Sequence, residues 1–259
     1  MQWAEVQAKI QATEGLITHA EAKRLYELAK SCGGTIVEIG SWKGKSTVCL
    51  ALGSMAGSKG KVFAVDPHQG TYDSFSGQYT ALNTEPMFRE NIKRAQADDI
   101  VTPLVMKSEE AAKKWTDPIS LLWIDGAHDY ENVNLDFTLW EPHLIPGGVI
   151  CFHDTLYCLG HPWRTYHGIK KVVIDNIFKS SKFSKVRFCD SMLYATKVTE
   201  LSIKERFLKR LRLFLYQTLL LIYFPLITLF VDIMIMTKLF RPVKLIKDKV
   251  LALIHGGDS

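Results

Sequence analysis

The sequence predicts an α/β fold in which a doubly wound, mostly parallel sheet carries helices on both faces. Three observations predict it. Apolar runs of strand length alternate with helical segments between residues 33 and 154. The strands are apolar along their whole length, as strands covered on both faces are. Polar residues follow the strand ends, which is typical of a parallel sheet whose site lies outside its carboxyl edge.

The elements are expected in this order along the chain. Residues 2–31 form two helices that cover the edge of the cleft, with a break at Glu14-Gly15. Five strands follow. They are Thr35 to Ile39, Lys61 to Asp66, Val101 to Met106, Ile119 to Ile124 and Gly148 to Phe152. Residues 185–189 and 192–197, joined by Asp190-Ser191, predict a hairpin. Residues 67–91 and 155–166 are long connections, as lids and substrate loops are.

The turn after the first strand predicts a site for a nucleoside. Gly40 and Gly44 let the backbone approach a ligand closely, and the free N–H groups of a helix that begins near Lys45 face the same point. A dinucleotide fingerprint would need a glycine in place of Trp42, and a phosphate loop would need one in place of Ile39. A nucleoside without a pyrophosphate is therefore the better interpretation.

A second acid follows where a ribose partner is expected. Asp66 ends the second strand, and an acidic side chain at that place can accept both ribose hydroxyls. The alternative is an acid that only caps a helix.

Four motifs then occur in a fixed order along the chain. They are Val37 to Ser46, Val65 to His68, Trp123 to Tyr130 and Leu144 to Asp154. With these motifs the chain resembles class I S-adenosylmethionine-dependent methyltransferases, in the branch related to catechol O-methyltransferases and to antibiotic-sugar (macrocin-type) O-methyltransferases. The resemblance covers residues 14–197. It implies a seven-stranded Rossmann-like methyltransferase sheet that ends in an antiparallel strand.

The resemblance also implies S-adenosylmethionine as the cofactor. Glu38 would bond its amino-acid end, Asp66 its ribose, and Ser108 would lie near its adenine. The full set of expected cofactor-binding residues is Glu38, Gly40, Ser41, Trp42, Gly44, Ser46, Asp66, Ser108 and Asp125. For Trp42 the alternative is plain packing, since an aromatic side chain in a tight turn often only covers the helix.

The same resemblance places a metal at Asp125, His153 and Asp154. In the catechol-type relatives the position of Asp125 is a metal-binding aspartate, and an acid-then-amide pair stands where this chain has His153 and Asp154. Mg²⁺ or Mn²⁺ prefers oxygen ligands. His153 therefore either shifts the preference towards softer metals or leaves Asp154 as the working ligand. The dependence on a divalent cation is left open.

The expected catalytic residues are His128 and Asp125. His128 stands where those relatives place a catalytic lysine, and an imidazole can remove a hydroxyl proton at neutral pH. The alternative for His128 is a hydrogen-bond donor that only supports its neighbours.

Charge divides the chain into two parts, a methyltransferase domain at 1–199 and a tail at 200–259. The tail holds ten Lys/Arg and five Asp/Glu, so it carries the whole net charge of +5. A neutral catalytic half argues against a nucleic-acid partner. Five scattered cysteines without a Cys-x-x-Cys pair favour a reducing cytosolic compartment.

The tail is expected to form a hydrophobic helical membrane anchor. Residues 213–237 carry one charge, Asp232, and a helix of that length would span roughly 37 Å. Basic residues flank both ends, which favours a re-entrant anchor bent at Pro225 on the cytoplasmic face over a full span. Membrane lipids would then contact residues 204–254. The alternative is a helix buried against the domain or against a second copy in a homo-oligomer.

These observations predict an O-methyltransferase that acts on a hydroxyl of a small-molecule or glycan acceptor at the bilayer, such as a lipid-linked sugar or a cell-surface polysaccharide. Two rivals remain. One is a methyltransferase of a lipid or quinone-like phenol. The other is a non-catalytic methyltransferase-like scaffold that its tail recruits to membranes.

Overall fold

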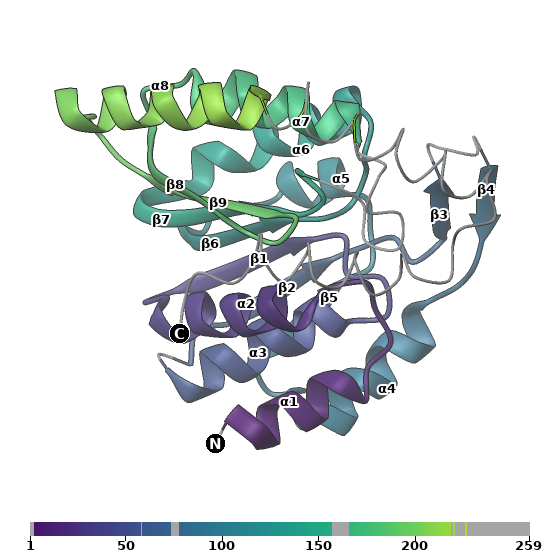
Figure 1. Cartoon of the computed structure of the whole chain (residues 1–259). Coiled ribbons are helices and arrows are strands. Elements are labelled where there is room, and N and C mark those ends of the chain that lie inside the picture. Colours follow the sequence, from purple (N-terminus) through teal and green to yellow (C-terminus); the bar gives the residue numbers. More distant parts are fainter. Residues whose placement is uncertain are drawn as a thin grey trace, which may run out of the picture.

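A computed structural model describes residues 3–57, 59–73, 78–156 and 166–218, together with residues 220 and 226 (Figure 1). At its centre lies a seven-stranded sheet with the order β5-β2-β1-β6-β7-β9-β8. The parallel strands are β1 (Thr35–Ile39), β2 (Val62–Val65), β5 (Val101–Leu104), β6 (Ile119–Ile124) and β7 (Leu144–Phe152). The chain runs outward from β1 to β5 and then returns to β6. The boundary between β1 and β6 is therefore a topological switch point, where ligands of such sheets bind.

Two antiparallel strands complete the sheet. They are β8 (Phe183–Cys189) and β9 (Met192–Lys197), and β9 lies between β7 and β8. This hairpin confirms the predicted one. The seven-stranded, mostly parallel sheet expected from the resemblance is confirmed as well.

Helices cover both faces of the sheet (Figure 1). One layer consists of α1 (Trp3–Gln11), α2 (His19–Ser31), α3 (Lys45–Ala56) and α4 (Glu85–Ala95). The other consists of α5 (Ser108–Ala112), α6 (Tyr130–Trp140), α7 (His167–Val172) with the π-helical turn η2 (Val173–Phe178), and α8 (Ile203–Thr218). The short helix η1 (Glu141–His143) leads from α6 into β7.

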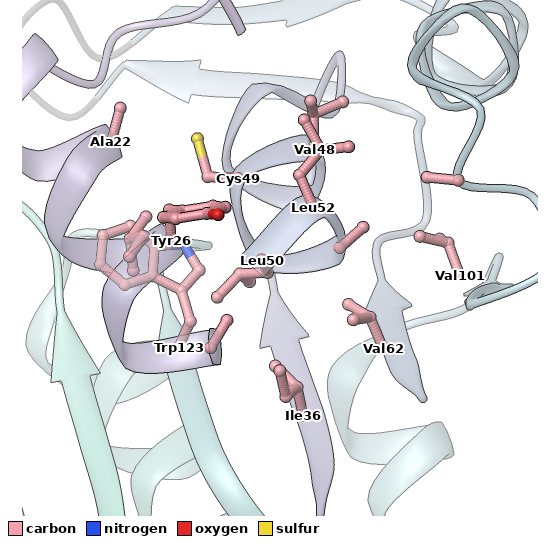
Figure 2. Packing of buried hydrophobic residues seen from close by; sticks show 14 of the residues in the cluster. Ala22, Tyr26, Ile36, Val48, Cys49, Leu50, Leu52, Val62, Val101 and Trp123 are labelled. Atoms are coloured by element: carbon pink, nitrogen blue, oxygen red, sulfur yellow. The ribbon is translucent and has the colours of Figure 1, made fainter. Parts of the chain in front are cut away.

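Alternate residues of each strand supply the two halves of the core. Ile36 packs with the α1–α4 layer and Val37 with the α5–α8 layer, as the two-residue period of a strand requires. Figure 2 shows Ile36, Val62 and Trp123 of the sheet close to Leu50 and Tyr26 of α3 and α2. Because both faces are apolar and covered, polar groups are left to the strand ends.

The predicted elements agree with the structure at most positions. β1 and β6 have the predicted bounds, and α3 begins at Lys45. β7 begins four residues earlier than predicted, because Leu144 already pairs with Ile119 before a register shift. The long connection at 67–91 is not without structure. It holds a second, two-stranded sheet of β3 (Gly70–Asp73) and β4 (Gln78–Ala81), followed by the start of α4.

The predicted loop at 155–166 and the predicted apolar run at 213–237 fall largely outside the described residues. In the part of the chain that the structure describes, none of the helices is both long and apolar enough to cross a membrane. The membrane anchor and the domain boundary at residue 199 therefore stay predictions.

Candidate active site

The glycine turn after β1 lies directly against the end of β6. Gly40 has φ +86°, and a Cβ at this position would lie 2.5 Å from the carbonyl oxygen of Asp125. The Asp125 amide in turn donates to the Ile39 carbonyl at 2.8 Å. No side chain fits here, so the backbone after β1 and the loop after β6 meet at one point of the sheet edge.

The second glycine of the turn begins the helix. Gly44 is the residue before α3 and has φ +88°, with the Phe88 ring 3.0 Å from where its Cβ would stand. Between the glycines, Trp42 also has a positive φ of 45°, which is uncommon for a bulky residue. Its ring is half-buried, and the Lys43 ammonium lies 4.5 Å from the ring centre.

Asp66 holds this turn in place. Its Oδ2 accepts hydrogen bonds from the backbone amides of Ser41 and Trp42, each at 2.8 Å, and its Oδ1 accepts from the His68 amide at 2.7 Å. The carboxylate is partly accessible. Asp66 thus fixes the shape of the glycine turn, a task that the sequence did not reveal, and its predicted contact with ribose stays a prediction.

Glu38 lies buried beneath the turn with one oxygen unused. Its Oε2 accepts from the Thr47 hydroxyl, whereas its Oε1 makes no hydrogen bond of good geometry among the described residues, although the hydroxyls of Ser41 and Ser46 interact with the carboxylate. Burial raises the pKa of Glu38 to about 7, although the hydroxyls of Ser46 and Thr47 oppose the shift. A buried oxygen without a partner is costly. A ligand that brings a cation or an N–H donor would relieve that cost, which fits the ammonium of an amino acid.

On the other side of the contact, a buried imidazole joins two carboxylates. His153 Nδ1 lies 3.1 Å from Asp125 Oδ1, and His153 Nε2 lies 3.3 Å from Glu21 Oε2. Burial lowers the pKa of the His153 imidazole, but the charges of Asp125, Asp154 and Glu21 outweigh it and raise this pKa well above its usual value. This arrangement favours the protonated imidazolium, which would donate to both carboxylates.

Glu21 reaches this site from α2, and the sequence analysis did not identify it. Its Oε2 accepts from the Thr18 amide at 2.8 Å, and its Oε1 accepts from the Ser191 amide at 2.9 Å and from the Ser191 hydroxyl at 2.6 Å. The Thr18-x-x-Glu21 spacing is a capping-box signal. That signal predicts the helix start, but it gives no hint of the contact with His153.

The predicted metal ligands do not fit a metal ion. An imidazolium has no free lone pair for a metal, and both His153 nitrogens face carboxylate oxygens. In the described parts of the chain, no group of three or more His, Cys, Asp and Glu side chains is placed to hold an ion. His153 Nδ1 lies 3.1 Å from Asp125 Oδ1 and 3.7 Å from Asp154 Oδ2, the two carboxylates that were expected to share the metal.

Next to this imidazolium lies a second histidine that is open to solvent. His128 Nε2 is 3.4 Å from Asp154 Oδ2, and its side chain is 21% exposed. Its ring lies on Tyr166, with the ring centres 4.0 Å apart. Asp154 has φ +53°, a strained conformation of the kind that occurs at functional sites. His128 and Asp154 thus form an imidazole–carboxylate pair.

A glycine in α7 supports the position of His128. A Cβ at Gly168 would lie 2.5 Å from the His128 carbonyl oxygen and 2.4 Å from the Tyr130 amide nitrogen. Helix α7 can therefore pack closely on the loop that carries His128. The sequence analysis missed this residue, since a lone glycine near a helix start has many explanations.

Ser108 is placed by two neighbours. Its hydroxyl accepts from the Trp140 indole at 2.8 Å. Its second neighbour is Asp136. Burial raises the pKa of Asp136 to about 6, although a hydrogen bond with Ser108 lowers it in part. Ser108 begins α5 at the end of β5, as predicted, and its contact with adenine stays a prediction.

Comparison with known proteins adds a family to this geometry. Residues 37–155 match the family model described as a methyltransferase domain. These residues hold the glycine turn, Asp66, the His128 loop and Asp154. This part of the chain is therefore similar to a methyltransferase domain.

One curated relative and two solved structures show how far the likeness extends. An uncharacterized protein of Sinorhizobium fredii is 35% identical over 123 residues, which cover 46% of this chain and 13% of that protein. The chain thus spans a small part of that relative.

The O-methyltransferase of Bacillus cereus in complex with SAH has a TM-score of 0.52 at 19% identity, over 75% of this chain and 90% of that one. The O-methyltransferase TomG of Streptomyces achromogenes, in complex with SAM, has a TM-score of 0.53 at 16% identity, over 74% and 89%. At these identities the two structures show that the methyltransferase domain has the fold of O-methyltransferases.

Proposed function

We propose that the protein is an S-adenosylmethionine-dependent O-methyltransferase that uses a histidine base. The observation that carries the proposal is the contact of Gly40 with the backbone of Asp125. It brings the turn above Glu38 and the loop of His128 to the same point of the sheet edge. A methyl donor in the turn and a hydroxyl beside His128 would then be neighbours.

Glu38 and Asp66 are the residues that we assign to the cofactor. The unused Oε1 of Glu38 would accept a hydrogen bond from the ammonium of the methionine part. Asp66, partly accessible beside the turn, would accept from the ribose hydroxyls. The complexes of TomG with SAM and of the Bacillus cereus enzyme with SAH support this choice of ligand.

When bound, S-adenosylmethionine supplies a methyl group on a sulfonium, which transfers in-line to an oxygen nucleophile. His128 would remove the proton of the acceptor hydroxyl as the carbon–oxygen bond forms. Asp154, 3.4 Å from His128 Nε2, orients the ring and stabilises the imidazolium that results. His153, protonated between Asp125 and Glu21, holds the carboxylates of this half in position. No step in this mechanism needs a metal ion.

For the acceptor, we infer a hydroxyl on a membrane-associated molecule such as a lipid-linked sugar or a cell-surface polysaccharide. Two features support this inference. The motifs resemble those of sugar O-methyltransferases, and the tail combines a net charge of +5 with the 25-residue apolar run at 213–237. The protein would work at the cytoplasmic face of a membrane.

The experiment that tests the proposal uses methyl-labelled S-adenosylmethionine and a membrane extract. We expect the purified protein to transfer label to a lipid-extractable or polysaccharide product. His128→Gln should lower the transfer rate by about 10²–10⁴-fold and leave cofactor affinity unchanged, because general-base catalysis contributes that much. His143→Gln, a histidine at η1, is the matched control and should retain the rate. Transfer by His128→Gln at the wild-type rate would remove His128 from the base role.

A further inference from the structure

The last described helix exposes an apolar stripe. On α8, Ile203 is 86% exposed, Phe207 66% and Phe214 64%, and Leu211 lies between them at 45%. The spacing of these residues puts them on one side of the helix. On a surface helix of a globular domain, the apolar stripe normally faces the core. On α8 it faces away from the domain.

The inward side of α8 is fixed by a buried lysine. The Lys209 ammonium donates to the carbonyl oxygens of Ser180 and Phe183, to the latter at 2.8 Å. Lys209 is 5% exposed, so a charged residue occupies the buried side of the helix. Rotating the stripe inward would break these bonds and leave the buried carbonyl groups without this donor. The outward direction of the stripe is therefore built into the fold.

A second inward residue connects α8 to the active site. Tyr216 is buried, its ring is stacked on Phe178 and Phe188, and its hydroxyl donates to the Thr155 carbonyl at 2.7 Å. Thr155 directly follows Asp154, the partner of His128. The end of α8 is thus joined to the acceptor half of the site, and in Figure 1 α8 lies across the outside of the α5–α7 layer.

Basic side chains flank the stripe. Arg206 and Arg210 lie along one side of it and Lys204 along the other, and all three are exposed. The predicted apolar run begins within α8, at Leu213, and ends at Thr237. Apolar residues between basic flanks are the pattern of a helix that lies in the surface of an anionic bilayer.

We propose that α8 docks the protein on an anionic membrane, with Phe207 and Phe214 in the boundary between headgroups and acyl chains. A second copy is a poorer occupant, because a two-fold pairing of the stripes would bring the same basic flanks together. The inference deepens the membrane-associated acceptor of the proposed function. It would place the His128 half of the site, joined to α8 through Tyr216, near the lipid surface.

Photo-crosslinking in the full chain tests lipid contact without any methyl transfer, so it can fail or succeed independently of the proposed activity. p-Benzoylphenylalanine is placed at position 207 or 214, and the protein is irradiated with vesicles of phosphatidylcholine and phosphatidylglycerol. We expect lipid adducts at both positions. The control position is Leu16, which is 61% exposed between α1 and α2, and it should give none. Adducts to a second copy or to residues 219–259, equal lipid labelling at position 16, or no adducts at all would overturn the proposal.

The basic flank is tested by sedimentation with the same vesicles. Arg206→Gln with Arg210→Gln should weaken binding roughly thirtyfold, at ~1 kcal/mol for each basic residue near the surface, and high salt should remove the difference from wild type. Lys113→Gln with Lys114→Gln changes the charge equally at the exposed end of α5 and should bind as wild type does. Equal weakening by both pairs would show a general charge effect and would contradict docking through α8.

Discussion

The two halves of the sheet edge differ in whether their buried charges are satisfied by the protein itself. In the half formed by β6 and β7, His153 lies between Asp125 and Glu21, so these charged groups have partners within the protein. In the half formed by β1 and β2, Glu38 keeps a buried oxygen without a partner among the described residues. The two halves touch where Gly40 meets Asp125. We therefore expect the β6–β7 half to contribute mainly to stability, and the β1–β2 half to gain the missing partner of Glu38 when a ligand binds.

This difference bears on how each half was inferred from sequence. The sequence predicts a metal ion shared by Asp125 and Asp154, with His153 as an altered ligand. In the structure His153 lies between Asp125 and Glu21, because Glu21 arrives from α2 on its far side. The comparison therefore predicts that substitutions in the two halves have opposite consequences for stability and for binding.

The largest expected effect is the loss of stability in His153→Ala. Removing one partner of a buried ion pair leaves the other charges uncompensated, which costs about 3–5 kcal/mol. Urea unfolding at pH 7 measures this cost. Gln at position 38 is the comparison, and we expect Glu38→Gln to unfold at the same urea concentration as wild type or at a higher one. Equal destabilisation by the two variants would remove the distinction between the halves.

The next effect is the pH dependence of stability that Glu38 introduces. Its folded pKa is about 7, above the ~4.5 of an unfolded glutamate, so the folded state binds more protons in this range. Stability should fall as pH rises from ~4.5 to ~7, by about 3 kcal/mol at most. We expect the difference in unfolding free energy between wild type and Glu38→Gln to follow this course. A difference that does not change with pH would show that Glu38 titrates normally in the folded protein.

His153 carries the same sign in a higher pH window. Its pKa is raised, so its stabilisation is complete below the unfolded value of ~6.5 and is lost as pH rises through the higher folded value. Measuring the free energy of unfolding of His153→Ala and Glu38→Gln across pH therefore distinguishes the contributions of the two halves, because their pH windows differ.

Much of this site was visible in the sequence, and the missing parts share a physical cause. Glu38 lies near the end of β1 and Gly40, Gly44 and Asp66 follow strand ends, and a parallel sheet brings strand ends to one edge. The same rule places Asp125, His128, His153 and Asp154. Glu21 and Gly168 lie on helices that are remote in sequence from the site residues they contact. Their role depends on how α2 and α7 pack, which no local pattern encodes.

The smallest of these effects concerns Asp66, which is assigned both a structural role and a role in ligand binding. It accepts from the amides of Ser41 and Trp42, and it is partly accessible to a ligand. Asp66→Ala should weaken SAH binding by about 1–3 kcal/mol, the value of a hydrogen bond to a charged group, and lower stability by roughly 1 kcal/mol. Calorimetry and urea unfolding measure the two. Asp98→Ala, at an exposed position, is the control and should change neither. A loss of stability with unchanged affinity would make Asp66 purely structural.

The central claim is that the cofactor supplies the missing partner of the buried Glu38 carboxylate. The most direct test is the calorimetric titration of SAH at pH 6.0 and 7.5. If the ligand ammonium binds ionised Glu38, the affinity of the wild-type protein should rise roughly eightfold between these pH values, as a group with a pKa of about 7 loses its proton. Binding should release protons into the buffer, and Glu38→Gln should bind more weakly with no such rise. An absence of SAH binding, or the same pH dependence in Glu38→Gln, would contradict the account.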